Sequence, residues 1–151
     1  MAHAVRVYLD NLVEGRAFVK LDFSNAFNSV RRDCLLEAVA LSLPDRLPFV
    51  QMAHGSPSHF WLGDEIPSSE EEVQQGDPLG SLLFSLTVQH LLVNSQCELT
   101  TGYLDDFGLG DQLPHLGRRI QVLESEALKL GLAVNHTKCE IFGLVPKDVS
   151  I

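Results

Sequence analysis

The sequence predicts an α+β domain in which helices pack on one face of an antiparallel sheet. Three observations support this class. Residues 16–22 alternate between apolar and more polar side chains, which is the pattern of a half-buried strand. Residues 79–93 and 116–130 instead repeat apolar side chains at helical spacing. The predicted elements follow the order strand, helix, short helix, hairpin, long helix, hairpin, long helix, hairpin, which is related to the ferredoxin-like split βαβ unit.

Composition indicates a single domain over residues 1–151. The chain is 45% hydrophobic and 21% charged, which is enough apolar material for one core, and no linker or repeat divides it. Its apolar stretches are shorter than the ~20 residues that cross a bilayer. No signal-peptide pattern begins the chain. We therefore expect an intracellular protein, in either the nucleus or the cytoplasm.

The cysteines and the net charge limit the classes of function. Cys34, Cys97 and Cys139 lie far apart without CxxC spacing, so neither a zinc site nor a disulfide framework is indicated. The net charge of −9 argues against binding of nucleic acid by this chain alone, because phosphate contacts usually draw on Lys and Arg. Much of the excess lies in the acidic stretch 64–72, which is more often a solvated loop than a site.

The strand over residues 16–22 should carry one apolar and one mixed face. Because side chains alternate along a strand, Asp22 ends it on the mixed face. A helix is expected over 31–42, and a short one after Asp45. The apolar face consists of Ala17, Val19 and Leu21, and the mixed face of Phe18, Lys20 and Asp22.

Two long helices and three hairpins complete the expected order. Asp77 and Pro78 suit the N-cap and first position of the helix over 79–93, and the helix over 116–130 should end at Gly131. The expected hairpins begin at Ser58 with a Gly63-Asp64 turn, span 99–109 with Leu104-Asp105-Asp106 at the tip, and span about 133–143.

Three aspartates are the candidate catalytic residues. Asp22 ends a strand and Asp105-Asp106 lies at a hairpin tip, so their carboxylates can meet if the two strands are neighbours. Carboxylates this close repel one another, and the usual remedy is a hard cation such as Mg²⁺, which prefers oxygen ligands. Two such ions about 3.5–4 Å apart can activate a 3′-hydroxyl and stabilise the leaving oxygen of a phosphoryl transfer. Taken singly, each aspartate is more often a helix cap or a solvated turn residue.

Four segments resemble, in order and approximate spacing, the successive palm motifs of non-LTR (LINE-type) retrotransposon reverse transcriptases. They are LDFSNAF (21–27), VQQGDPLGSLLFSL (73–86), YLDD (103–106) and LGLAVNHTKCE (130–140). The resemblance implies a polymerase palm that acts as an RNA-directed DNA polymerase, a nucleotidyltransferase that adds dNMP to a primer 3′-hydroxyl. It also implies partners, namely an RNA template, a DNA primer and dNTPs.

The same resemblance implies the roles of individual residues. Asp22 and Asp105 would hold two Mg²⁺ ions, or Mn²⁺ in their place, with Asp106 as a supporting carboxylate. The remaining implied roles concern the nucleotide: Phe27 as a gate against the ribose 2′-hydroxyl, Gln75 and Gly76 beside the incoming nucleotide, and Lys138 near its phosphates. Each has a simpler alternative: a core aromatic for Phe27, loop residues for Gln75 and Gly76, and a solvated strand lysine for Lys138.

Several features depart from the family pattern. Fingers and thumb regions are largely missing, and Glu72 stands where the family commonly has glycine. Together with the net acidity, these departures leave open a catalytically silent palm, degenerate or domesticated, that serves as a folded interaction module. Another two-carboxylate palm enzyme, such as a nucleotide cyclase or an RNA-templated RNA polymerase, is a third alternative that Phe27 and the YLDD tetrad disfavour.

Overall fold

The computed structural model describes residues 2–54, 58–59, 68–69 and 78–143. Both helices and strands are present within these ranges, and no helix there is long and apolar enough to cross a membrane. The elements in chain order are α1 Ala2–Asp10, β1 Arg16–Leu21, α2 Ala26–Ser29, α3 Arg32–Ser42, η1 Pro44–Arg46, α4 Leu47–His54, β2 Ser58–His59, β3 Ser68–Ser69, α5 Gly80–Ser95, β4 Leu99–Tyr103, β5 Asp106–Gln112, α6 Leu113–Lys129 and β6 Glu140–Gly143.

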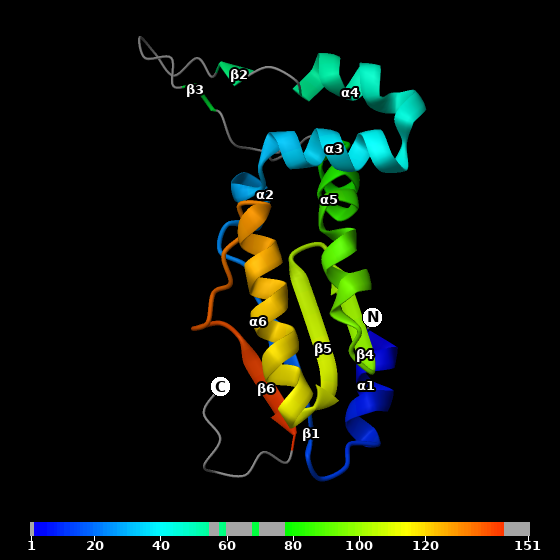
Figure 1. Cartoon of the computed structure of the whole chain (residues 1–151), viewed down its shortest axis with the longest axis vertical. Helices are drawn as coiled ribbons and strands as arrows, with labels where there is room; N and C mark the ends of the chain where they lie inside the picture. The colour runs from blue at the N-terminus through cyan, green and yellow to red at the C-terminus, as the bar shows by residue number, and fades with distance from the viewer. Residues whose placement is uncertain (1, 55–57, 60–67, 70–77, 144–151) are drawn as a thin grey trace.

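A four-stranded sheet with the order β4-β5-β1-β6 forms the centre of the molecule (Figure 1). Each strand is antiparallel to its neighbours. Helices α5 and α6 pack on one face, so the α+β class predicted from the sequence is confirmed. Helix α3 packs against α5 beyond one end of the sheet, and α4 packs on α3.

The core lies between the sheet and the α5–α6 layer. Its residues are all less than a tenth exposed. Full burial of a Val, Leu, Ile or Phe side chain stabilises the fold by roughly 1.5–3 kcal/mol. The alternation predicted for β1 is therefore confirmed, because its apolar face points into this core. The contributors include Ala17, Val19 and Leu21 of β1, Phe107 and Leu109 of β5, Leu83, Phe84, Val88 and Leu91 of α5, and Leu116, Ile120 and Leu123 of α6.

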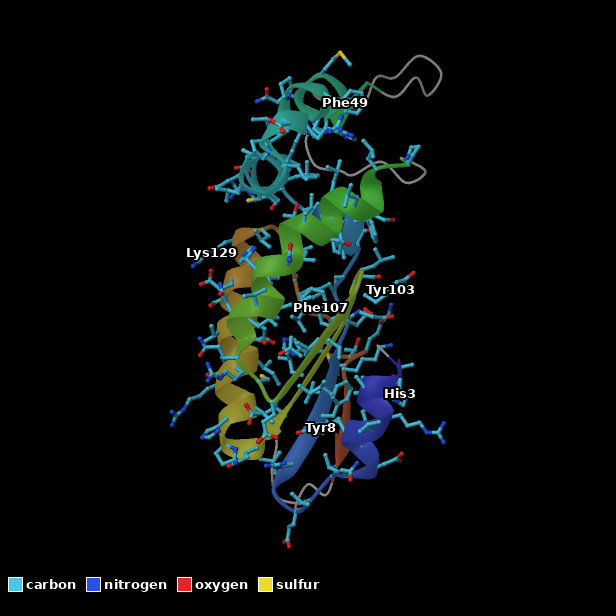
Figure 2. The ribbon with its side chains drawn as sticks, turned by 90° about the vertical axis from the view of Figure 1, so that its right-hand side faces the viewer. His3, Tyr8, Phe49, Tyr103, Phe107 and Lys129 are labelled. Atoms are coloured by element: carbon cyan, nitrogen blue, oxygen red, sulfur yellow. The ribbon has the colours of Figure 1, made fainter. Side chains whose placement is uncertain are left out.

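Helix α1, which the sequence patterns did not predict, covers part of the opposite face (Figure 2). Its Tyr8 ring lies 6.4 Å from the ring of Phe18, which is 4% exposed. Gly110 makes the approach possible, because a Cβ at that position would lie 2.7 Å from the Tyr8 ring. The mixed face of β1 is thus more buried near its start than alternation alone suggests.

Most of the predicted helices form as expected. Helix α3 matches the stripe over 31–42, and η1 with α4 supplies the short helical region at and after Asp45. Helix α5 begins at Gly80, two residues later than Pro78, and the predicted cap Asp77 lies outside the described residues. Gly131 follows the end of α6 with φ +87°, a left-handed conformation that favours glycine.

The hairpin expected over about 133–143 is wrong. Two parts of this segment pair with the same edge of β1 and its continuation rather than with each other. Strand β6 lies along β1, while Val134 bridges Phe23 further along. The backbone N–H and C=O groups along this edge of residues 17–24 can form more hydrogen bonds with the segment than a short hairpin within 133–143 could form internally. Of the first predicted hairpin, β2 and β3 pair antiparallel, and its Gly63-Asp64 turn lies outside the described residues.

Candidate active site

Strand register brings two of the predicted carboxylates to the same end of the sheet. In the β1–β5 pair, Leu21 lies opposite Phe107, so the next position along is Asp22 on one strand and Asp106 on the other. In the β4–β5 pair, Tyr103 lies opposite Asp106, which makes Asp105 part of a two-residue loop. The predicted tight hairpin is thereby confirmed, with Leu104 and Asp105 at its tip and Asp106 as the first residue of β5.

The hairpin tip contains a residue in a strained backbone conformation. Leu104 has φ +56°, although two-residue hairpin loops that need positive φ usually contain Gly, Asn or Asp there. Such a conformation costs of the order of 1–3 kcal/mol in a residue with a side chain. Leu104 is half-buried and borders an apolar hollow together with Phe107 and with Val88 and Leu92 of α5. Its neighbour Asp105 is left exposed at the tip.

Two contacts anchor the end of β1 that carries Asp22. Phe23 is 3% exposed and packs edge-on against Phe107, with ring centroids 5.1 Å apart. The Asp22 carbonyl oxygen accepts a hydrogen bond of 2.8 Å from the backbone N–H of Asn135. The Asp22 backbone is therefore tied both to the core and to the turn that leads into β6.

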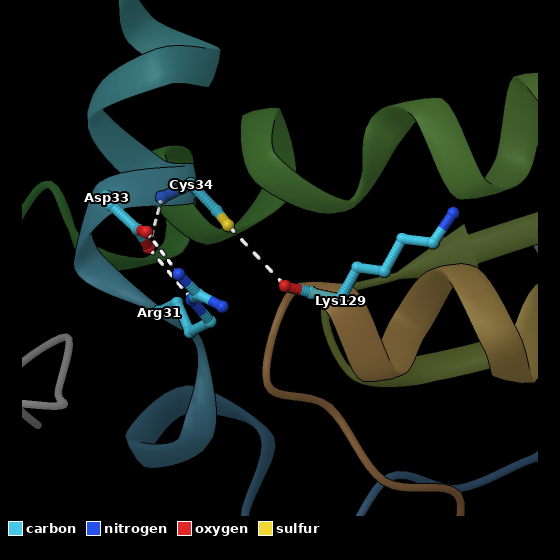
Figure 3. A network of polar contacts seen from close by, with 4 residues as sticks. All are labelled: Arg31, Asp33, Cys34 and Lys129. Carbon is cyan, nitrogen blue, oxygen red and sulfur yellow. Dashed lines mark hydrogen bonds and ion pairs between the residues drawn. The ribbon is translucent and has the colours of Figure 1, made fainter.

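The segment after Asp22 is fastened to the helical layer by a polar network (Figure 3). Arg31, just before α3, pairs with Asp33 through both of its carboxylate oxygens. The Arg31 backbone N–H donates to the Leu130 carbonyl at 2.8 Å, and Cys34 Sγ lies 3.7 Å from the Lys129 carbonyl oxygen. These links join the start of α3 to the end of α6, which fixes the loop between Asp22 and α3.

A lysine that was not among the predicted site residues pairs with one of the aspartates. Lys20 Nζ is 3.0 Å from Asp106 Oδ1, and its hydrogen bond to that carboxylate is the largest cause of a raised Lys20 pKa. The charges of Asp106, Glu140 and Asp22 add to the same effect. Its position two residues before Asp22 on a strand was the available signal, since alternate residues share a face.

The oxygen-only donor set of Asp22, Asp105 and Asp106 suits a hard divalent cation such as Mg²⁺. The positively charged Lys20 ammonium group forms an ion pair with one of these carboxylates, that of Asp106. Within the described residues, however, no three Asp, Glu, His or Cys side chains lie close enough together to hold a metal ion. One oxygen of Asp106 lies against the Lys20 ammonium group.

The predicted nucleotide-binding residues have different positions. Phe27 lies in α2, half-buried, and stacks on Phe84 with ring centroids 4.5 Å apart, so its alternative as a core aromatic is partly realised. Lys138 is exposed in the turn whose Asn135 binds the Asp22 backbone, which brings this turn to the aspartate end of the sheet. Gln75 and Gly76 lie outside the described residues.

Comparison with protein families gives a match over nearly the whole chain. The model described as reverse transcriptase (RNA-dependent DNA polymerase) matches residues 2–147. A search of curated proteins found no match.

Solved structures with this fold include yeast telomerases. Telomerase from Candida tropicalis, in complex with a TWJ fragment of telomeric RNA, is similar with a TM-score of 0.69 and 14% identity, covering 97% of this chain and 29% of that one. The corresponding complex from Candida albicans gives a TM-score of 0.62 at 12% identity, covering 99% of this chain and 31% of that one. The chain thus spans about a third of these telomerase chains, and at this identity the likeness concerns the fold.

Proposed function

Because the chain belongs to the reverse transcriptase (RNA-dependent DNA polymerase) family, we propose that it is the catalytic palm of an enzyme that adds deoxynucleotides to a primer 3′ end on an RNA template. The observation that carries the proposal is the register of β1 with β5. Leu21 lies opposite Phe107, so Asp22 and Asp106 are the adjoining residues at the same end of the two strands, and Asp105 is in the loop before Asp106. An ordinary solvated turn would not require an aspartate on the neighbouring strand end as well.

The three aspartates have different roles in the proposed metal site. Asp22 and Asp105 would hold two Mg²⁺ ions, with Asp106 as a supporting carboxylate and Mn²⁺ as a substitute. Bound there, the ions would supply Lewis-acid activation of the 3′-hydroxyl and stabilisation of the leaving oxygen. The protein's own contribution is to fix the carboxylates, through the tight β4–β5 hairpin and through the packing of Phe23 on Phe107 just after β1.

The residues around the aspartates suit a nucleotide substrate. We assign Phe27 to exclusion of the ribose 2′-hydroxyl, Gln75 and Gly76 to the incoming nucleotide, and Lys138 to its phosphates. The exposed position of Lys138, in a turn tethered to Asp22, supports the last of these assignments. An ammonium group there would offset the charge that develops on the triphosphate.

The larger protein around this palm is also part of the proposal. The four motifs at 21–27, 73–86, 103–106 and 130–140 support a non-LTR, LINE-type origin. The net charge of −9 supports a division of labour, in which fingers and thumb regions supply the basic surfaces that grip template and primer. The structurally similar Candida tropicalis telomerase was solved with telomeric RNA, which supports nucleic acid as the partner.

A metal-binding experiment tests this proposal. Titration calorimetry with Mn²⁺ compares the wild-type chain with Asp22→Asn and Asp105→Asn, while primer extension on an RNA template is measured with fingers and thumb regions present. Binding and extension should both be lost in the two variants. Asp45→Asn is the matched control, because Asp45 is an exposed acid in η1 that packs with α3 and α4. Equal Mn²⁺ binding by all four proteins would contradict the proposal.

The second candidate is a catalytically silent palm that serves as an interaction module. Two observations favour it: the net charge of −9, and the absence of a three-residue metal cluster within the described residues. In this case the folded wild-type chain would bind Mn²⁺ no better than Asp22→Asn, and the complete polymerase would not extend a primer. The same titration therefore separates the two functions.

A further inference from the structure

A row of charged side chains crosses three strands on the aspartate-bearing face of the sheet. Lys20 lies in its middle, opposite Glu140 of β6 on one side and opposite Gly108 of β5 on the other. Asp106 is two residues from Gly108, so it shares the face of Lys20 as a diagonal neighbour. One cation therefore stands within reach of an acid on each neighbouring strand.

The glycine explains why Lys20 turns toward Asp106. A Cβ at Gly108 would lie 2.4 Å from the Phe18 ring, so the position has no room for a side chain of its own. Without a side chain opposite it, Lys20 can extend along β5, and its Nζ comes to 3.0 Å from Asp106 Oδ1. Glu140 is exposed and, within the described residues, makes no ion pair.

The Lys20–Asp106 ion pair contributes little to the stability of the fold. The two side chains are 39% and 48% exposed, and ion pairs this accessible to water contribute little to folding. The pair nevertheless occupies one of the two oxygens of Asp106, a carboxylate assigned to the proposed cation site. A divalent cation that binds this carboxylate must compete with the ammonium group.

We propose that Lys20 is the resident counter-ion of Asp106 and that Glu140 takes over Lys20 when a divalent cation binds the aspartates. This rests on the proposed function, since the cation is the one assigned there. Residues directly opposite one another on paired strands have Cβ atoms about 4.5–5.5 Å apart, so the lysine reaches Glu140 by rotation of its side chain alone. Lys20 is thus a positioning residue that limits metal affinity, and Glu140 relieves that limit.

The proposal sets the direction of two substitutions. Lys20→Met keeps the length and apolar stem of the side chain but removes the competing charge, so Mn²⁺ should bind about two- to fivefold more tightly. Glu140→Gln removes the alternative acceptor, so Mn²⁺ should bind more weakly by a similar factor of about two to five. In the Lys20→Met background, Glu140→Gln should have little further effect, because no lysine remains to be transferred.

Calorimetry with Mn²⁺ on the wild type, both single variants and the double variant measures this coupling as a double-mutant cycle. The control is Arg16→Met, which removes a positive charge from the other end of β1, where Arg16 pairs with Glu98 at 3.1 Å. Arg16→Met should leave the Mn²⁺ dissociation constant unchanged. Circular dichroism confirms that each variant is folded.

The possible outcomes separate this inference from the proposed function. Non-additive effects of Lys20→Met and Glu140→Gln support the exchange of partners. Additive effects, unchanged or weaker binding by Lys20→Met, or an equal effect of Arg16→Met would overturn it. If Asp22→Asn abolishes binding while Lys20→Met equals the wild type, only the role of Lys20 fails. Mn²⁺ binding that survives in Asp22→Asn, or that no variant shows, overturns the proposed function as well.

Discussion

The two faces of β1, a strand of six residues, have different roles: one packs in the core, and the other carries a residue of the candidate site. On one face, Ala17, Val19 and Leu21 are at most 2% exposed and pack beneath α5 and α6. On the other face, the Lys20 side chain is 39% exposed and reaches an aspartate. Because neighbouring residues on a strand point to opposite faces, the two sets are held in register by one backbone. The packed face of β1 therefore positions the polar side chains of the other face, although those side chains remain exposed to water.

The sharpest way to break this comparison is to alter two neighbouring residues. Leu21→Ala leaves a cavity in the core and should lower the free energy of unfolding by about 2–5 kcal/mol. Lys20→Met removes an exposed ion pair and should change it by less than about 1 kcal/mol. Urea denaturation followed by circular dichroism measures both values. Similar losses for the two variants would show that the faces are not separated in this way.

Much of this division could be predicted from the sequence, because it follows from local patterns. The alternation over 16–22 correctly assigned the faces, and the hairpin around Asp105-Asp106 followed from flanking strand segments. Helical periodicity likewise located α3, α5 and α6. These signals depend on residues close together in the chain.

The features that were missed depend on contacts between distant residues. Helix α1 has no buried residue, so its place follows from Tyr8 meeting Phe18 and Gly110 rather than from its own pattern. Strand β6 joined β1 because that edge was open, which no pattern within 133–143 reveals. Lys20 became part of the candidate site only through its diagonal contact with Asp106.

Phe27 sharpens the comparison because it belongs to both regions. Phe27→Ala should lower the free energy of unfolding by about 1–3 kcal/mol, since a half-buried ring stacked on Phe84 is lost. It should also raise ribonucleotide incorporation when fingers and thumb regions are present. Phe27→Leu is the control, because it keeps most of the bulk and should keep sugar discrimination. Unchanged discrimination in Phe27→Ala would remove the gate assignment and leave only a core aromatic.

On the face of the sheet that α1 covers, a buried hydroxyl group without a hydrogen-bond partner among the described residues destabilises the fold. The Tyr8 hydroxyl is buried and, within the described residues, has no hydrogen-bond partner, and burial raises the pKa of Tyr8. Tyr8→Phe should therefore stabilise the fold by about 1 kcal/mol. The control is Tyr103→Phe, since Tyr103 is 67% exposed and its hydroxyl meets water. Thermal unfolding compares the variants, and a destabilised Tyr8→Phe would indicate a partner for this hydroxyl.

The smallest expected effect lies outside both faces, at the start of α3. The Arg31 guanidinium lowers the pKa of Asp33 from 3.8 to about 2. Since the folded pKa lies below the unfolded one, the stabilisation is present above pH ~4 and is lost as the pH falls through about 2. Asp33→Asn should cost less than about 1 kcal/mol at pH 7, because the pair is exposed, and only a small part of that at pH 2.

Unfolding measurements at the two pH values, with Asp45→Asn as the exposed control, test this assignment. A difference between the wild type and Asp33→Asn that stays the same at pH 7 and pH 2 would assign the effect to helix capping rather than to the ion pair.

The central claim is that three aspartates at one end of the sheet form a divalent-cation site. Paramagnetic broadening by Mn²⁺ in an NMR spectrum of the chain locates such a site directly. The amide signals of Phe23, Leu104 and Phe107 should disappear at the lowest Mn²⁺ concentrations, while those of α4 remain, and Asp22→Asn should abolish this pattern. Broadening that is centred elsewhere, or that is the same in Asp22→Asn, would contradict the claim.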